Sequence, residues 1–436
     1  MKKLVCAAIS ILSAALVVSC KGKAKEESNG FNPSLNLETR CAIKVVGDYD
    51  NFEALEAEFD RFNEYYPNVT LSYRKYSNYS TNLTDALTKE DAPNIFFSCA
   101  SWMAGNETYS NIVSHMEDLS DSALKIDLSC LRQGLINRNE DGKVFMAPVF
   151  SRTYGTLVNN DLFVKEGLEV PNSWNELLNV CASFKEKGYA SPMMGYTQGS
   201  SSCLMNTVAY PAFVAALAGN PEALAKANEA PSAKPPYAEP AAGEYMREAL
   251  SKVKQLFDDG AIDIALCNEI SDNYKQVLLR FFKGDVPMMI CTGDTVSGRK
   301  KREKESAEFG NNPFNYTFVP IPLTNEGGYF IDSPSVEFSV NKDCKNLDMT
   351  NEFMRFLFRK DELKNIASFK GLINSTSDIS FGAMYSSFAE VPVERTFSPE
   401  VLGVKDPMAQ QIKNASYKVG KGELTIEEAI SQYGLV

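Results

Sequence analysis

The chain has 436 residues, which is too long for a single hydrophobic core and predicts two lobes of roughly 150–200 residues each. Its composition, with 44% hydrophobic and 23% charged residues, is that of an ordinary globular protein. A formal net charge of −12 repels phosphate backbones and anionic lipid, so the composition argues against nucleic acid as a partner.

The first 40 residues have the pattern of a processing segment followed by a tether. Lys2 and Lys3 supply a positive n-region, residues 4–18 an apolar h-region, and VVSC at 17–20 has the form of a lipobox. We therefore predict a lipoprotein signal peptide over residues 1–19, lipid attachment at Cys20 and a flexible lipid-anchored tether over residues 20–40. The alternative is an ordinary signal peptide in which Cys20 is incidental. The apolar stretch is too short to predict a membrane span.

The mature chain opens with a strand, a helix and a second strand. Residues 41–47 have a β pattern, residues 51–65 carry a helical apolar stripe, and residues 69–73 alternate again. Residues 92–97 predict a third strand, which is followed closely by Trp102. In open α/β sheets the carboxyl edge of the strands is where ligands bind, so Asp48, Tyr49 and Trp102 become candidate ligand contacts.

Residues 142–196 contain the most organised stretch of the chain. Two short strands are predicted over 144–148 and 156–158, and Ser173 precedes Glu176 by three residues, the spacing of a capping box. Apolar residues then recur at helical intervals up to Phe184. The string GKVFMAPV, followed by YGTLVNNDLFVKEGLEVPNSWNELLNVCASFKEKGYASPMMGY, resembles the central signature of the family 1 extracellular solute-binding proteins. These are the sugar-capturing receptors of ABC importers.

The resemblance extends over almost the whole mature chain. The stretches FFKGDVPMMICTGD at 281–294, YTFVPIP at 316–322 and GLIN at 371–374 are similar to further family motifs. One departure is that Asp294-Thr295 stands where the family usually has an aromatic residue. The resemblance implies an α/β, two-lobe periplasmic-binding-protein fold of type II, in which each lobe is a mixed sheet flanked by helices. Chain crossings are expected near 148–154, 317–322 and 373. They place the N-terminal lobe in 41–150 and 318–373, and the C-terminal lobe in 151–317 and 374–436.

The function implied by this resemblance is that of the substrate-binding lipoprotein of an ABC importer. Such a receptor captures a sugar or oligosaccharide between its lobes by hinge closure and delivers it to the permease. The expected partners are the solute, the transmembrane permease subunits and, through the lipid anchor, the membrane of the cell envelope, either periplasmic or at the cell surface. The receptor is expected to be a monomer. Two alternatives stay open: the same fold binding glycerol phosphate, a polyamine or an organic anion, and a surface lipoprotein with an adhesive or hydrolytic role.

Motifs for catalysis or cofactors are scarce. His115 is the only histidine and no G-x-S-x-G accompanies it, so a Ser-His-Asp triad is not predicted. No P-loop motif is present, and the cysteines after Cys20 show no C-x-x-C spacing typical of a zinc site. Among 56 acidic residues no pair is singled out for glycoside hydrolysis. We predict no enzyme activity, no metal and no cofactor, and the pattern does not specify which cysteines pair.

A sugar site needs apolar ring faces and polar side chains that bind hydroxyls. Tyr154 lies at the first expected crossing, where the resemblance places ligand contacts beside the hinge. Asp294 follows a predicted strand of the second lobe, where a carboxylate can accept hydrogen bonds from two sugar hydroxyls. The predicted ligand-binding residues are Asp48, Tyr49, Tyr79, Trp102, Tyr154, Tyr196, Gln198 and Asp294.

Overall fold

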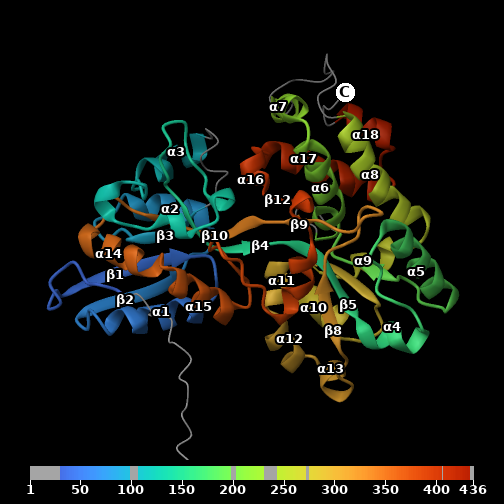
Figure 1. Ribbon diagram of the computed structural model, residues 1–436, viewed down its shortest axis with the longest axis horizontal. Helices are drawn as coiled ribbons and strands as arrows, with labels where there is room; N and C mark the ends of the chain where they lie inside the picture. The colour runs from blue at the N-terminus through green and yellow to red at the C-terminus, as the bar shows by residue number, and fades with distance from the viewer. Residues whose placement is uncertain are drawn as a thin grey trace, which may run out of the picture.

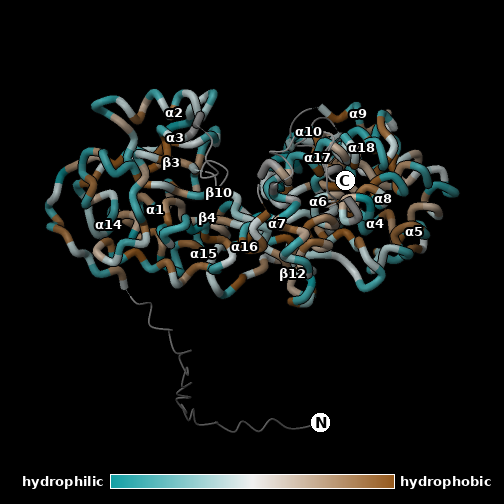
Figure 2. Tube along the Cα trace, turned by 90° about the horizontal axis from the view of Figure 1, so that it is seen from above, coloured by the Kyte–Doolittle hydropathy of each residue, from teal (hydrophilic) through white to brown (hydrophobic). Residues whose placement is uncertain are grey.

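The computed structural model describes residues 30–98, 107–197, 203–229, 243–271, 274–404 and 406–432, and these form two α/β lobes (Figure 1). Each lobe has its own sheet and its own main hydrophobic core. Seen from above, the two bodies lie side by side with β4 and β10 at their junction (Figure 2). The prediction of two lobes from chain length is confirmed.

The first lobe is built on a six-stranded mixed sheet. Its strand order is β11 (Ile373–Asn374), β4 (Ala147–Arg152), β10 (Ser333–Val340), β3 (Ile95–Ser98), β1 (Cys41–Gly47) and β2 (Val69–Lys75). β1 pairs in parallel with both β2 and β3, whereas β10 runs antiparallel to β3 and β4. Because β1, β2 and β3 are parallel, their carboxyl ends meet at one edge of the sheet, as the sequence pattern predicts.

Helices cover both faces of this sheet (Figure 1). On one face lie α1 (Glu53–Asn63), α14 (Leu347–Leu357) and α15 (Lys360–Lys370), and on the other lie α2 (Tyr79–Leu87) and α3 (Glu107–Ser114). Adjacent residues of β3 point to opposite faces, since Phe97 belongs to the core under α1 and Phe96 to the smaller core under α2. The apolar stripe of α1 is buried at Leu55, Phe59 and Phe62, which confirms the helical pattern there.

The second lobe has a four-stranded sheet in the order β6 (Met193–Met194), β7 (Met288–Thr292), β5 (Tyr154–Asn159) and β8 (Tyr316–Val319). β5 runs antiparallel to β7 and β8, and β6 runs parallel to β7. All six residues of β5 are buried, which explains why its sequence does not alternate between polar and apolar residues.

Helices of the second lobe surround this sheet (Figure 1). One half of the capping box predicted at Ser173 is present, because its side chain accepts the Glu176 N–H and so starts α5 (Trp174–Glu186), while the Glu176 carboxylate accepts the N–H of Asn172 instead of that of Ser173. The other helices are α4 (Asn160–Glu166), α6 (Cys203–Ala218), α7 (Pro221–Glu229), α8 (Gly243–Asp258), α9 (Ile264–Asn268), α10 (Tyr274–Phe281), α11 (Gly293–Ser297), α12 (Arg299–Glu305), α13 (Ala307–Asn311), α16 (Pro399–Leu402), α17 (Asp406–Gly420) and α18 (Ile426–Gln432). Among the described residues, no helix combines the length and apolar character needed to cross a membrane.

The chain passes between the lobes three times. Thr153 alone separates β4 from β5, and Asp332 alone separates β9 (Phe330–Ile331), which packs in the second core, from β10. The third passage, residues 375–382, runs from β11 to the 3-10 helix at Ala383–Glu390, which also packs in the second core. The second passage lies later than the 317–322 expected from the sequence, because Phe318 is still buried in the second core.

Residues 31–40 are packed on the first lobe. Phe31 is buried against the rings of Phe62 and Phe356, with the Arg355 guanidinium 4.4 Å from its ring centroid. The backbone N–H and side-chain hydroxyl of Ser34 both donate to Glu352 at 2.7 Å. This part of the predicted flexible tether is therefore docked, because its one aromatic ring and its serine match groups on α1 and α14. Residues 1–29, with the predicted signal peptide and Cys20, lie outside the described residues.

No disulfide joins any two of the cysteines whose side chains are described. Burial raises the pKa of the Cys181 thiol to about 12 and that of the Cys267 thiol to about 11, so both remain neutral apolar groups. The cysteines concerned are Cys41, Cys130, Cys181, Cys267, Cys291 and Cys344.

Candidate functional site

Asp294 connects the two lobes. It lies in the first turn of α11, directly after β7, where the Thr292 side chain caps the helix. The Asp294 carboxylate accepts a hydrogen bond from the Ser335 hydroxyl on β10 of the first lobe, and it lies 3.7 Å from Nη1 of Arg152 at the end of β4. A carboxylate of the second lobe is thus held by two side chains of the first.

Tyr49 brings an aromatic ring to the same place. It follows β1, and its ring makes edge contacts with Phe52 and Phe97 at 5.3 Å between centroids. The Lys370 ammonium, at the end of α15, lies 4.3 Å from the Tyr49 ring centroid, within cation–π distance. Burial, followed by the negative charges of Asp294 and Asp48, raises the pKa of Tyr49, so its hydroxyl stays protonated and able to donate.

The charges around Tyr49 influence one another. Burial raises the pKa of Asp48, and the charge of the Asp294 carboxylate raises it further. The backbone N–H of Asp48 and the charge of Lys75 lower this pKa and so oppose the rise. Burial lowers the pKa of Lys370, an effect that Glu53 and Asp294 partly offset. Carboxylates from two lobes therefore share one electrostatic environment.

We call these six residues the inter-lobe cluster: Asp48, Tyr49, Arg152, Asp294, Ser335 and Lys370. The cluster combines two carboxylates, two cations, a hydroxyl and a phenol that presents both a ring and a hydroxyl. Such a set offers hydrogen-bond donors and acceptors in both lobes with no net charge. It is suited to a neutral solute that carries many hydroxyl groups.

A cavity of about 200 Å³ lies between α15 and the 3-10 helix at Ala383–Glu390. Tyr385 lines it, and its hydroxyl lies 3.1 Å from the carbonyl oxygens of both Gly293, in the second lobe, and Gly371, at the end of α15. Gly371 has a φ of 72°, a conformation that disfavours other residues at this position. The cavity and Tyr385 therefore lie beside the contact between the lobes, and their polar lining is Arg299, Lys364, Ser368, Asn374, Ser380 and Tyr385.

The remaining predicted ligand contacts lie in other surroundings. The Tyr79 hydroxyl donates to the Phe97 carbonyl at 2.9 Å, next to the end of β1. Tyr154 and Tyr196 are buried in the second core, and Tyr154 makes an edge contact with Tyr210 at 6.0 Å. The Lys413 ammonium lies 5.0 Å from the Tyr210 ring, so this aromatic pair also has a cation beside it. The other two predicted contacts, Trp102 and Gln198, lie outside the described residues.

Three members of the cluster were not predicted from the sequence. Arg152 stands two residues before Tyr154 at the first passage, which is a weak positional signal. Ser335 lies where β10 has a register shift, and Lys370 ends a helix, and neither position carries a distinctive motif. His115, the only histidine of the chain, lies away from the cluster, with Nδ1 2.8 Å from the Asp343 carboxylate. In the described parts of the chain, no group of three or more His, Cys, Asp or Glu side chains could hold a metal ion.

A sequence model described as "Bacterial extracellular solute-binding protein" matches residues 47–364. The chain belongs to this family. Family membership implies a periplasmic or extracellular location and a binding role, and it confirms the resemblance seen in residues 142–196. No curated protein matches the chain.

Solved structures of solute-binding proteins share the fold. The GacH receptor of Streptomyces glaucescens, studied unliganded and with acarbose, is 18% identical with a TM-score of 0.66, over 91% of this chain and 97% of that one. The apo form of RafE from Streptococcus pneumoniae is 15% identical with a TM-score of 0.65, over 93% and 98%. A sugar transporter protein from Bacillus licheniformis in complex with stachyose is 17% identical with a TM-score of 0.61, over 90% and 98%. The predicted α/β two-lobe fold is thereby confirmed.

Proposed function

We propose that this protein is the substrate-binding component of an ABC importer and that it captures a sugar or oligosaccharide between its two lobes. The single observation that carries the proposal is the inter-lobe cluster, in which Asp294 of the second lobe meets Ser335 and Arg152 of the first. A solute that replaces these contacts with its own hydroxyl groups would favour the closed arrangement by interactions made only there.

The carbohydrate class is supported by two arguments. Tyr49 combines a ring face with a hydroxyl, and Asp48 and Asp294 supply carboxylates on opposite sides, a combination that sugars require. Two of the three similar structures named above were determined with a bound oligosaccharide or analogue, acarbose in one and stachyose in the other.

The cellular setting belongs to the same proposal. Residues 1–19 would be removed as a signal peptide, Cys20 would carry lipid, and residues 20–30 would link it to the first lobe. The receptor would act as a monomer at the cell envelope and present its closed form to the permease subunits. It would perform no chemistry on the solute. We propose that the described residues of 41–152 and 333–374 form one lobe and those of 154–331 and 383–432 the other.

The test is thermal melting of residues 21–436 against raffinose, stachyose, a maltose series and chitin oligosaccharides, with putrescine and glycerol 3-phosphate as non-sugar probes. A ligand that binds only the native state adds RT ln(1 + [L]/Kd), about 2.7 kcal/mol at a hundredfold excess over Kd, which is a readable shift. One sugar class should raise the melting temperature, and Asp294→Ala and Trp102→Ala should remove the effect. Glu140→Ala, an exposed loop change in the first lobe, is the matched control. A shift with putrescine or glycerol 3-phosphate alone, or with no compound, would overturn the carbohydrate assignment.

A further inference from the structure

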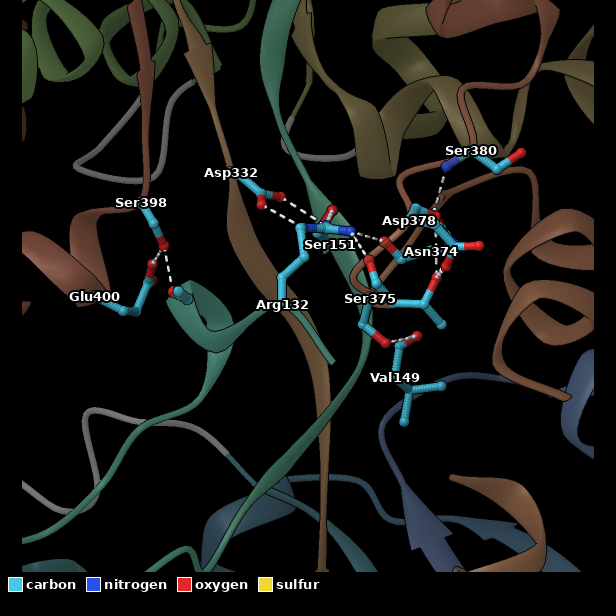
Figure 3. Close-up of polar contacts among 12 residues, drawn as sticks. Arg132, Val149, Ser151, Asp332, Asn374, Ser375, Asp378, Ser380, Ser398 and Glu400 are labelled. Carbon is cyan, nitrogen blue, oxygen red and sulfur yellow. Dashed lines mark hydrogen bonds and ion pairs between the residues drawn. The ribbon is translucent and has the colours of Figure 1, made fainter. Parts of the chain in front are cut away.

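Arg132 donates to groups that lie on or next to all three passages between the lobes, and Figure 3 draws it with Asp332, Ser151 and Asn374. Its Nε and Nη2 donate to the two carboxylate oxygens of Asp332 at 2.7 and 3.0 Å, a bidentate ion pair on the second passage. Nη2 also donates to the Ser151 hydroxyl on β4 at 2.8 Å, next to the first passage. Nη1 donates to the carbonyl oxygens of Asn374, the last residue of β11, and of Thr376 on the third passage, at 2.6 and 2.9 Å.

These five contacts use the full donor capacity of a guanidinium group, which has five N–H bonds. Both partners of the ion pair are nearly buried, with 11% of the Arg132 side chain and 8% of the Asp332 side chain exposed. The group therefore has no spare donor to bind a solute, and its partners all lie on the passages or on the strand residues next to them. A lysine at this position would offer three donors from one point and could not reproduce the planar arrangement.

The backbone of Arg132 is itself fixed to the first lobe. Its N–H donates to the Ser375 carbonyl at 2.9 Å, and Leu131 pairs with Thr376 in an isolated antiparallel bridge. Leu131 is buried in the first core. The Ser375 hydroxyl donates to the Val149 carbonyl at 3.1 Å, which ties the start of the third passage to β4, the strand that leads into the first passage (Figure 3). The backbone of Arg132 is thus tied to the start of the third passage.

Two other contacts between the lobes differ in kind. In one of them the Ser335 hydroxyl donates to Asp294. In the other the hydroxyl of Ser398, beside α16, donates to the Gly134 carbonyl. Each bond connects the facing surfaces of the two lobes and not the passages between them. Separation of the lobes breaks such contacts. The acceptors of Arg132, by contrast, all lie on the passages or next to them, so rotation of the lobes moves them little.

We propose that Arg132 is the positioning residue of the hinge, and that its guanidinium keeps the three passages together while the lobes rotate about them. The contacts of Arg132 persist when the lobes separate, and the contacts of Asp294 and Ser398 do not. This inference rests on the proposed function insofar as it requires hinge motion, but it makes no use of the identity of the solute.

The test is small-angle X-ray scattering of the full mature chain without solute, together with thermal melting, for wild type and Arg132→Lys. We expect Arg132→Lys to increase the radius of gyration and the maximum dimension of the protein, because the passages are no longer held together. The matched control is Arg280→Lys, since Arg280 forms a two-point ion pair with Asp285 that lies wholly within the second lobe. The control should lower the melting temperature and leave the scattering curve unchanged.

A lower melting temperature for Arg132→Lys with a scattering curve identical to that of wild type would overturn the proposal, because that result describes a purely structural ion pair. If Arg132→Lys does not fold, Asp332→Asn keeps the shape of the partner while removing its charge, and the same scattering criterion decides. The scattering experiment contains no solute, so it tests the role of Arg132 even if no sugar binds. Likewise, an unchanged scattering curve for Arg132→Lys would leave the result of the sugar-binding experiment unaffected.

Discussion

Glu400 lies on α16 beside the contact between the lobes, and its burial predicts a specific pH dependence of stability. The Ser398 hydroxyl lies 3.3 Å from the Glu400 carboxylate and also bonds the Gly134 carbonyl of the first lobe (Figure 3). Burial raises the pKa of Glu400 from 4.5 to about 7, and Asp332 raises it slightly further, while its own backbone N–H, Arg152 and Ser398 oppose the rise. The folded protein therefore binds this proton more tightly than the unfolded chain does.

The sign of the effect follows from linkage. Between pH 4.5 and about 7 the folded state holds more protons than the unfolded state, so the free energy of unfolding falls as the pH rises through this window. The full rise corresponds to about 3 kcal/mol at 1.36 kcal/mol per pKa unit, and partial exposure of the side chain reduces this to about 2 kcal/mol. Glu400→Gln stays neutral at every pH and should be about 2 kcal/mol more stable than wild type at pH 8.

The assay is urea unfolding of both proteins at pH 4.5, 5.5, 6.5 and 8. The difference in unfolding free energy should be small at pH 4.5 and grow toward pH 8, whereas Glu140→Gln, an exposed change, should show no such growth. A difference that is constant with pH, or one that grows toward acid, would refute the reasoning. Other buried acids, such as Glu58, titrate in both proteins and cancel in the comparison.

Two further predictions concern the packing of the lobes. Phe31→Ala removes a buried ring from α1 and α14 and should lower the unfolding free energy by about 3 kcal/mol in urea unfolding, while Leu37→Ala, at an exposed leucine, should change it by less than about 0.5 kcal/mol. Equal effects of the two changes would show that residues 31–40 are not docked. Tyr385→Phe removes a hydroxyl placed between the Gly293 and Gly371 carbonyls and should cost about 1 kcal/mol by the same method. Tyr274→Phe, at a half-exposed ring, serves as its control, and an unchanged stability of Tyr385→Phe would contradict the proposed link between the lobes.

The sequence alone determined the local elements and the strand ends. The apolar stripe of α1 and the capping serine of α5 depend on neighbours three or four residues away, so their pattern is visible in the chain. Asp48, Tyr49 and Asp294 were predicted as site residues for a similar reason, because a residue that follows a parallel strand lies at the edge of the sheet wherever the strand is placed.

Only the tertiary structure decided which of these residues meet. Ser335 lies 41 residues from Asp294 and in the other lobe, and Arg132 lies 200 residues from Asp332. Such pairs depend on strand register and on how the two lobes pack, and neither leaves a periodic signal in the chain. The docking of Phe31 was missed for the same reason. The charged and polar composition of its segment is that of a tether, and the surface that Phe31 and Ser34 contact is formed by residues far away in the chain. Local sequence patterns therefore predicted individual helices and strands, whereas the contacts between the lobes and around the passages depend on long-range packing.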